Sequence, residues 1–295
     1  MSIYGHITEN NLKTAFIMVF FVLFTGMLAL ILGKSLGYGT SWVGLALIIA
    51  GLTSLGSYYY SDKIVLGISG ARPADRKKDF DFYTVAENMA IAAGLPKPKV
   101  YVIDDTAPNA FATGRDPQHA VVCATTGLIQ KLSRRELEGV IAHELSHIKN
   151  YDIRLMAIVT VLVGTIALLS DWFTRSLWWR RRDNNRNVSA ALMLVSLILV
   201  FISPIIATLI QLAVSRKREY LADAQAALLT RNPDALASAL DKITKDKEVL
   251  EAATNATAHL YIANPFKEKK FSAWYSNLFN THPPIGERIR ILRDM

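Results

Sequence analysis

Residues 139–152 read GVIAHELSHIKNYD, and soon after them the chain turns apolar, in LMAIVTVLVGTIALL. Ser133 stands just before this stretch in the capping-box pattern S-x-x-E, which marks the start of a helix. Apolar residues then recur at helical spacing, at Leu137, Val140, Ile141 and Leu145. The stretch therefore predicts a helix that packs one face on a core and ends beside a membrane-like segment.

Two histidines of this predicted helix, His143 and His147, are four residues apart, so their imidazole rings lie one turn apart and converge on one ion. Glu144 beside the first histidine completes the pattern H-E-x-x-H. In this pattern a bound metal lowers the pKa of a water molecule. The glutamate accepts the proton of that water as it attacks a carbonyl, and then delivers the proton to the leaving amine. The alternative is a pair of ordinary helix histidines near a membrane surface.

A catalytic zinc site needs a third protein ligand, which must come from elsewhere in the chain. Glu219 in SRKREYLADAQAA is the best candidate, and Asp223 follows one turn later on the same helical face. There Asp223 can accept a hydrogen bond from the far nitrogen of a ligand histidine. The two carboxylates would equally balance Arg216, Lys217 and Arg218 on a solvated face, so the residues alone leave both interpretations open.

Four apolar blocks predict membrane segments, at residues 14–33, 35–61, 155–170 and 188–215. A helix of about 20 apolar residues crosses the hydrocarbon core, and the first, second and last blocks reach that length. The third block is extended by Trp172 and Phe173 but interrupted by Asp171, so a buried core helix stays an alternative there. The first block is too long for a signal peptide and lacks a small-residue cleavage site, so we interpret it as an uncleaved anchor.

The distribution of charge predicts an orientation. Only Lys34 lies between the first two blocks, whereas positive residues follow the second block at Lys63, Arg72, Arg76, Lys77 and Lys78. This asymmetry places the chain from about residue 62 onward in the cytoplasm, and the single cysteine, Cys123, agrees with a reducing compartment. The net charge of +8 is explained by these flanks. Because the positive residues are not gathered on one soluble helix, we expect no nucleic-acid partner.

The loop between the last two blocks opposes this rule. If both blocks cross the membrane, five arginines lie on the far side, at Arg175, Arg180, Arg181, Arg182 and Arg186. A similar number of positive residues flanks the hairpin on the other side, at Lys149, Arg154, Arg216, Lys217 and Arg218. Charge therefore leaves open whether this hairpin spans the membrane or dips into it and returns. We expect four membrane segments.

The chain has two polar regions. Residues 62–150 lie between the second and third apolar blocks, and residues 216–295 follow the last block. The first begins with SGARPADRKK, which has no regular pattern and reads as a linker. It continues with a predicted helix within 79–93, stopped by Gly94 and Pro96, and with three short predicted strands, at 99–104, 109–113 and 120–125. The second region is predicted to be mostly helical, with Asn232 as a cap and Pro233 at the first helical position.

The segments NAFATG, HELSH, SRKREYLAD and HPPIGERI, with a pair of spans after HELSH, resemble the HtpX-type membrane zinc metalloproteases. These belong to the larger family that includes the CAAX-prenyl endopeptidase Ste24. The resemblance covers essentially the whole chain. It implies one Zn²⁺ per chain, with ligands His143, His147 and Glu219 and with Glu144 as the base. The implied fold is α-rich α+β: an integral membrane protein with about four membrane helices and a gluzincin-type zinc protease domain.

Four segments follow from this resemblance. They are an N-terminal transmembrane hairpin (1–61), a first catalytic part (62–154), a second membrane hairpin (155–215) and a second catalytic part (216–295). The resemblance implies a multi-pass protein of the bacterial inner membrane with its active site facing the cytoplasm. Its expected partners are the lipid bilayer and unfolded or membrane-protein polypeptides. It would hydrolyse these in stress-related quality control, in cooperation with other membrane proteases.

The resemblance also suggests a substrate-binding edge strand that pairs with extended substrate backbone, formed by Asn109, Ala110, Phe111 and Ala112. The alternative role for Asn109 is that of a turn residue after Pro108. His282 in THPP resembles a family histidine near the site and would stabilise the oxyanion as a second catalytic residue. The alternative is a residue that stiffens the turn before two prolines. Three other histidines have no partner at ligand spacing, namely His6, His119 and His259.

Two other classes of protein fit the sequence less well. A carboxylate-bridged di-iron protein would use Glu144 and His147 as a Glu-x-x-His pair, but it needs a second such pair, and the sequence has none. A membrane adaptor with a structural zinc would need a closed site of four ligands, usually with cysteines. The only cysteine, Cys123, lies on a predicted strand before the histidines.

Overall fold

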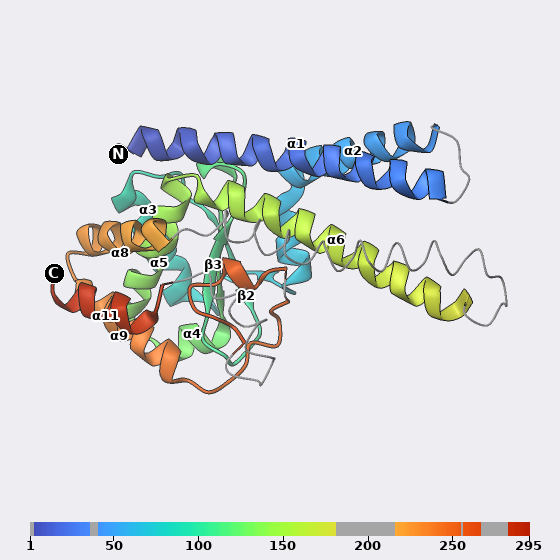
Figure 1. Ribbon diagram of the computed structural model, residues 1–295. Coiled ribbons are helices and arrows are strands. Elements are labelled where there is room, and N and C mark those ends of the chain that lie inside the picture. The colour runs from blue at the N-terminus through green and yellow to red at the C-terminus, as the bar shows by residue number, and fades with distance from the viewer. Residues whose placement is uncertain (1–2, 36–40, 181–215, 255, 267–282) are drawn as a thin grey trace.

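The computed structural model describes residues 3–35, 41–180, 216–254, 256–266 and 283–295 (Figure 1). The helices of this part are α1 (Ile3–Ser35), α2 (Ser41–Ile68), α3 (Phe80–Ala93), α4 (Thr126–Lys131), α5 (Arg134–Lys149), α6 (Asp152–Arg180), α8 (Arg216–Thr230), α9 (Pro233–Lys245) and α11 (Ile285–Arg293), with short 3-10 turns η1 (Pro117–His119) and η2 (Ala258–Leu260). The strands are β1 (Arg72–Pro73), β2 (Lys99–Ile103), β3 (Ala110–Thr113) and β4 (Val121–Thr125). The chain is thus mostly helical, with one small sheet.

Helices α1, α2 and the first half of α6 pack together, and one end of each extends beyond the rest of the molecule (Figure 1). Within the described residues, two helical stretches are long and apolar enough to cross a membrane, Thr8–Met27 and Val43–Ile68. They expose large apolar side chains to their surroundings, as Leu12, Phe16, Leu23, Ile48 and Leu52 do. Because burying such side chains is favourable, these helices fit a lipid environment. The predicted first hairpin is therefore supported.

The second predicted hairpin is described only in part. Helix α6 begins at Asp152 and runs for 29 residues to Arg180. Its first half packs against α1 and α2, where Leu155, Ile158 and Leu162 are buried. The predicted last block, 188–215, lies outside the described residues. A count of four membrane helices therefore stays a prediction.

The sheet has the strand order β1-β2-β4-β3. Strands β2 and β4 are parallel, with Tyr101 opposite Cys123, whereas β1 and β3 pair antiparallel with their neighbours. The three strands predicted from alternating apolar residues are confirmed within one residue at each end. Strand β3 lies at one edge of this sheet, next to helix α5, which carries His143 and His147.

Strand β1 corrects the prediction that SGARPADRKK is a linker without structure. It has only two residues, too few for an alternating pattern to reveal. Pro73 has no backbone N–H, and the strand accordingly lies at the sheet edge. The Arg72 guanidinium fixes the segment by ion pairs of 2.9 Å to Asp79 and 3.0 Å to Asp104.

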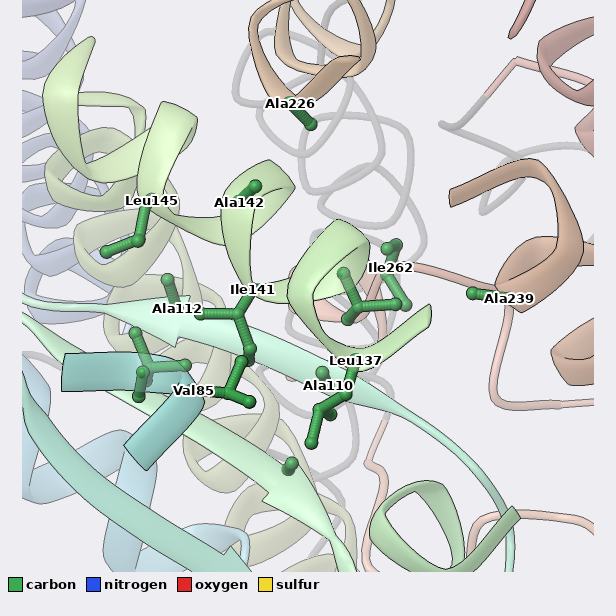
Figure 2. Close-up of a cluster of buried hydrophobic side chains, with 14 of the residues drawn as sticks. Val85, Ala110, Ala112, Leu137, Ile141, Ala142, Leu145, Ala226, Ala239 and Ile262 are labelled. Atoms are coloured by element: carbon green, nitrogen blue, oxygen red, sulfur yellow. The ribbon is translucent and has the colours of Figure 1, made fainter. Parts of the chain in front are cut away.

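Helix α5 lies between the sheet and the C-terminal helices. The capping box predicted at Ser133 and Glu136 is present at its start. Figure 2 shows Leu137 and Ile141 of α5 pointing onto the strand that carries Ala110 and Ala112. On the other side, Gly139 allows α9 to approach closely, because a Cβ added at Gly139 would lie 3.0 Å from the Leu236 backbone. The core thus joins residues from both predicted catalytic parts.

The opposite face of the sheet is covered by α2, by α6 and by the segment 250–261. Phe111 and Cys123 point to this side and pack with Val65 of α2, Met156 of α6 and Tyr261. The rings of Phe111 and Tyr261 meet edge to face with centroids 5.2 Å apart. The sheet is therefore held between α5 on one face and the C-terminal end of α2 and the start of α6 on the other.

Candidate active site

Helix α5 brings the two motif histidines together inside the protein. The Nε2 atoms of His143 and His147 are 3.2 Å apart, and the two rings are nearly perpendicular. Both side chains are buried. Two ring nitrogens that face each other at this distance are arranged to share one ion. The alternative of two ordinary surface histidines does not fit this geometry.

Glu219 reaches the same point from helix α8. Its carboxylate oxygens lie 3.7 Å from Nε2 of His143 and 3.5 Å from Nε2 of His147. One ligand atom from each of the three residues fits within a separation of 4.8 Å. Glu219 and Asp223 are each only 2% exposed, so they do not form the solvated face that the sequence left open.

The far nitrogen of each histidine contacts a carboxylate. Nδ1 of His143 lies 3.0 Å from Asp223, and Nδ1 of His147 lies 2.9 Å from Asp152. Each carboxylate accepts a hydrogen bond from Nδ1–H. The proton of the neutral ring is then on Nδ1, and the Nε2 lone pair is directed at the shared point. Two imidazoles with this tautomer and one carboxylate are a ligand set typical of catalytic zinc sites. The residues therefore fit a metal ion.

Asp152 takes part in the site although the sequence analysis gave it no role. It is the first residue of α6, directly after a two-residue turn that ends α5. In that turn Tyr151 has a positive φ of 59°, which few residues other than glycine adopt. This tight reversal folds Asp152 back onto His147, five residues earlier. The only sequence signal is the motif's own ending, KNYD.

Arg288 of α11 is a second residue that the sequence analysis missed. Its guanidinium is fully buried and donates two hydrogen bonds to Asp223, of 2.8 and 2.7 Å. It also lies 3.4 Å from the Glu219 carboxylate. A two-pronged contact of this kind fixes both the position and the charge of Asp223. Arg288 belongs to the segment HPPIGERI, which carried the resemblance but gave no residue-level role for it.

Glu144 lies beside the metal ligands and is buried. Burial raises the pKa of Glu144 to about 7, and the negative charge of Glu219 adds to the rise, whereas His147 and a hydrogen bond with the Ala112 backbone act against it. A carboxyl group whose pKa is close to neutral can both take and return a proton at physiological pH. Glu144 therefore has the protonation behaviour that a general base requires.

The pKa values of the two histidines shift in opposite directions. Burial lowers the pKa of His143, and the contact with Asp223 only partly opposes this. Burial also acts to lower the pKa of His147, but the hydrogen bond with Asp152 and the charge of Glu219 outweigh it and raise the pKa to about 9. The nearby carboxylates thus outweigh burial at His147 but not at His143.

The edge strand β3 lies next to α5, but Phe111 packs on the far face of the sheet, and the substrate-binding role of residues 109–112 stays a prediction. Ala112 of β3 makes its backbone hydrogen bond with Glu144, while the Ala110 carbonyl accepts one from Ile262 at 3.0 Å. The side chain of Asn109 is buried and donates to the Ala263 carbonyl at 3.0 Å. This contact favours a structural role for Asn109. His282 lies outside the described residues.

Two other histidines, His119 and His259, make contacts with residues that are not metal ligands. His119 forms a surface pair with Asp116 at 2.7 Å. His259 is buried, with Nε2 3.3 Å from the Thr160 hydroxyl.

Comparison with known proteins shows the family to which the chain belongs. Residues 76–295 match the sequence profile of peptidase family M48. A protein named "Protease HtpX homolog" from Caldanaerobacter subterraneus subsp. tengcongensis is 46% identical over 97% of this chain and 96% of its own. Another of the same name from Dictyoglomus turgidum is 47% identical over 99% and 94%. The crystal structure of S. mikatae Ste24p matches with a TM-score of 0.49 and 19% identity, over 98% of this chain and 66% of that one. The chain therefore belongs to peptidase family M48, and it is a metalloprotease.

Proposed function

We propose that the protein is a zinc-dependent endopeptidase that cleaves misfolded or damaged membrane proteins at the cytoplasmic side of a bacterial inner membrane. One observation carries the proposal. His143, His147 and Glu219 direct their ligand atoms at one point, beside a glutamate whose pKa burial raises to about 7. This arrangement suits hydrolysis of an amide bond by water.

Zinc is the metal that this ligand set favours, and it would be held by the three residues named above, one ion per chain. Bound there, zinc lowers the pKa of a coordinated water and polarises the substrate carbonyl. Glu144 takes the proton of the attacking water and passes it to the nitrogen of the leaving amine. Asp223 and Asp152 keep the two imidazoles in the tautomer and orientation that ligation needs.

The substrate is proposed to be an extended polypeptide. Strand β3 is the edge of the described sheet on the side of the site, and the Ala112 backbone points to Glu144. Main-chain pairing with such an edge requires no particular side chain, so it suits many unfolded sequences. Such pairing requires an extended segment with free backbone groups, so a folded segment would not bind.

The bilayer is proposed to supply the substrates. Helix α5, which carries two ligands, is followed after a two-residue turn by α6, and α1 and α2 pack beside α6. The site thus lies at the base of the membrane helices, where loops and released ends of membrane proteins are found. The positive residues after the second span support a cytoplasmic site. Quality control shared with other membrane proteases would fit this position.

The variant Glu144→Gln tests the mechanism. It removes the proton acceptor but keeps the size of the side chain, so we expect hydrolysis of an unfolded protein to fall by about 10²- to 10⁴-fold. The zinc content of the purified, detergent-solubilised protein should stay at one ion per chain. Glu138→Gln, on the same helix but paired with Arg134 at the surface, is the matched control and should cleave normally. Cleavage by Glu144→Gln at the normal rate would show that the assigned base is wrong.

A further inference from the structure

The first membrane helix carries a buried polar side chain at the level of the metal ligands. Asn10 belongs to the apolar stretch Thr8–Met27 of α1, yet it is only 2% exposed, whereas its neighbour Leu12 is 67% exposed. The start of α1 lies beside the part of the molecule that holds α8 (Figure 1). Burying a carboxamide is unfavourable unless its polar atoms find partners, so the contacts of Asn10 indicate what it does.

Asn10 makes three hydrogen bonds, and all of them reach elements of the metal site. Its Nδ2 group donates to the Asn150 carbonyl at 3.0 Å and to Oδ1 of Asp152 at 2.8 Å. Its Oδ1 atom accepts from Arg218 at 2.9 Å. The same Arg218 nitrogen also donates to Oδ1 of Asp152 at 3.1 Å. Asn10 therefore joins the turn after α5, the start of α6 and the start of α8.

Two of these partners stand directly next to predicted zinc ligands. Asp152 uses its other oxygen, Oδ2, to hold Nδ1 of His147 at 2.9 Å. Arg218 immediately precedes Glu219 in the chain. One carboxamide thus fixes the carboxylate that orients the second histidine and the residue next to the third ligand. A small displacement of either would misplace a ligand atom.

We propose that Asn10 is a positioning residue of the metal site, so that the first membrane helix completes the site rather than only anchoring it. This inference rests on the proposed zinc site. According to this inference, the affinity for the metal depends on how α1 packs against the catalytic part. The substrate class of the protease does not depend on this role, because Asn10 acts through Asp152 and Arg218.

A neighbouring contact separates positioning from simple anchoring. Asn11, the next residue of α1, is exposed and accepts a hydrogen bond of 2.7 Å from Arg154 of α6. This contact also ties α1 to α6, but it does not touch Asp152 or Arg218. Asn11→Ala therefore removes a contact between α1 and α6 from the same helix and leaves the contacts of Asp152 and Arg218 in place. It is the matched control for Asn10→Ala.

The experiment measures zinc affinity by competition with a chelator on the full chain in detergent. We expect about 10-fold weaker binding for Asn10→Ala, 10- to 100-fold weaker binding for Asp152→Asn, and wild-type affinity for Asn11→Ala. With Co²⁺ as the probe ion, the absorption bands, which report ligand geometry, should shift in Asn10→Ala and not in Asn11→Ala. Thermal unfolding of each metal-free protein shows that the variants are folded.

Each outcome decides one question. If the wild-type protein binds no zinc, the proposed function fails, whatever Asn10 does. If the wild type binds zinc and Asn10→Ala matches Asn11→Ala in affinity and in its Co²⁺ spectrum, Asn10 only anchors the helix and the inference is wrong. Should Asn10→Ala not fold, Asn10→Ser, which retains a small polar group, is judged by the same comparison.

Discussion

Arg288 shows how a fully buried residue that is not itself a proposed ligand can determine the shape of a metal site. Its side chain is 0% exposed, and a positive charge is expensive to bury unless it is paired. It is paired with Asp223, which in turn holds His143. The chain of contacts therefore runs from α11 at the C-terminus, through α8, to the first ligand on α5.

Arg288→Lys tests this chain of contacts at the scale of one residue. Lysine keeps the positive charge but replaces the planar fork by a single point of contact, so Asp223 loses one of its two fixed hydrogen bonds. We expect the rate of proteolysis and the zinc affinity each to fall by about 10- to 100-fold. Arg290→Lys, an exposed position on the same helix, should leave both unchanged. Equal activity in the two variants would contradict a role for Arg288.

At the residue scale, the sequence predicts what depends on local spacing. His143, Glu144 and His147 follow from one helix turn, whereas Glu219 stayed open until the resemblance was considered. Asp152 and Asn10 could not be predicted, because their roles depend on a turn with an unusual φ and on contacts between residues 142 positions apart. A hydrophilic residue at the start of a span gives no sign of its partner.

At the scale of elements, α5 is joined to α9 by one buried carboxylate. Glu136 caps α5 by accepting from Ser133, and it also accepts from Ser238 at 2.6 Å and from Lys242 at 2.7 Å. Burial alone would raise the pKa of Glu136, but these hydrogen bonds outweigh it and lower the pKa to about 2. The folded protein therefore prefers the ionised form more strongly than the unfolded chain does.

The stability of this junction should depend on pH. Because the pKa of Glu136 is lower when folded, its contribution is complete above the ordinary value of 4.5 and is lost as the pH falls towards 2. Lys242 is partly exposed, so after screening by solvent we expect about 1–2 kcal/mol. Glu136→Gln should thus unfold more easily than wild type at neutral pH, and the difference should shrink below pH 4.5. Thermal unfolding across this range measures it.

The exposed pair of Glu248 with Lys131 provides the control for this measurement. Glu248→Gln should change the unfolding temperature little at any pH, because surface ion pairs contribute little. A constant difference between Glu136→Gln and wild type from neutral to acid pH would contradict the assignment.

Elements with a clear period of apolar residues were predictable from the sequence. A very short strand and the packing between elements far apart in the sequence were not. Helix α3, strands β2 to β4 and the cap of α5 are confirmed because apolar spacing and capping residues specify them locally. Strand β1 was missed because two residues carry no period. The packing of α5 against α8 and α9 could not be derived either, because it joins two polar regions separated by the second apolar hairpin.

At the scale of the whole molecule, the main expectation is its orientation in the membrane. Cys123 is the only cysteine, it is fully buried, and burial raises the pKa of its thiol, so it gives little background in labelling. New cysteines at Tyr38, Asp183 and Lys245 would report on the first loop, the second loop and the catalytic part. The Lys245 side chain is 75% exposed and suits a reagent that reacts only with accessible thiols.

An impermeant maleimide added to intact spheroplasts should label Tyr38→Cys and Asp183→Cys, and it should label Lys245→Cys only after the membrane is opened. This follows if α1 and α2 cross with their connecting loop outside, and if the second hairpin also crosses. Labelling of Lys245→Cys in intact spheroplasts would overturn the cytoplasmic assignment. Labelling of Asp183→Cys only in opened spheroplasts would show that the second hairpin returns to the same side.

The order of the ligands along the chain has a meaning for synthesis. A ribosome delivers His143 and His147 first, and Glu219 emerges only after α6 and the rest of the stretch up to residue 218 have been made. Arg288, which holds Asp223, follows Glu219 later still, in α11. A chain interrupted between His147 and Glu219 would hold only two of the three ligands, so the cutting centre is completed only after the apolar stretch between them has been made.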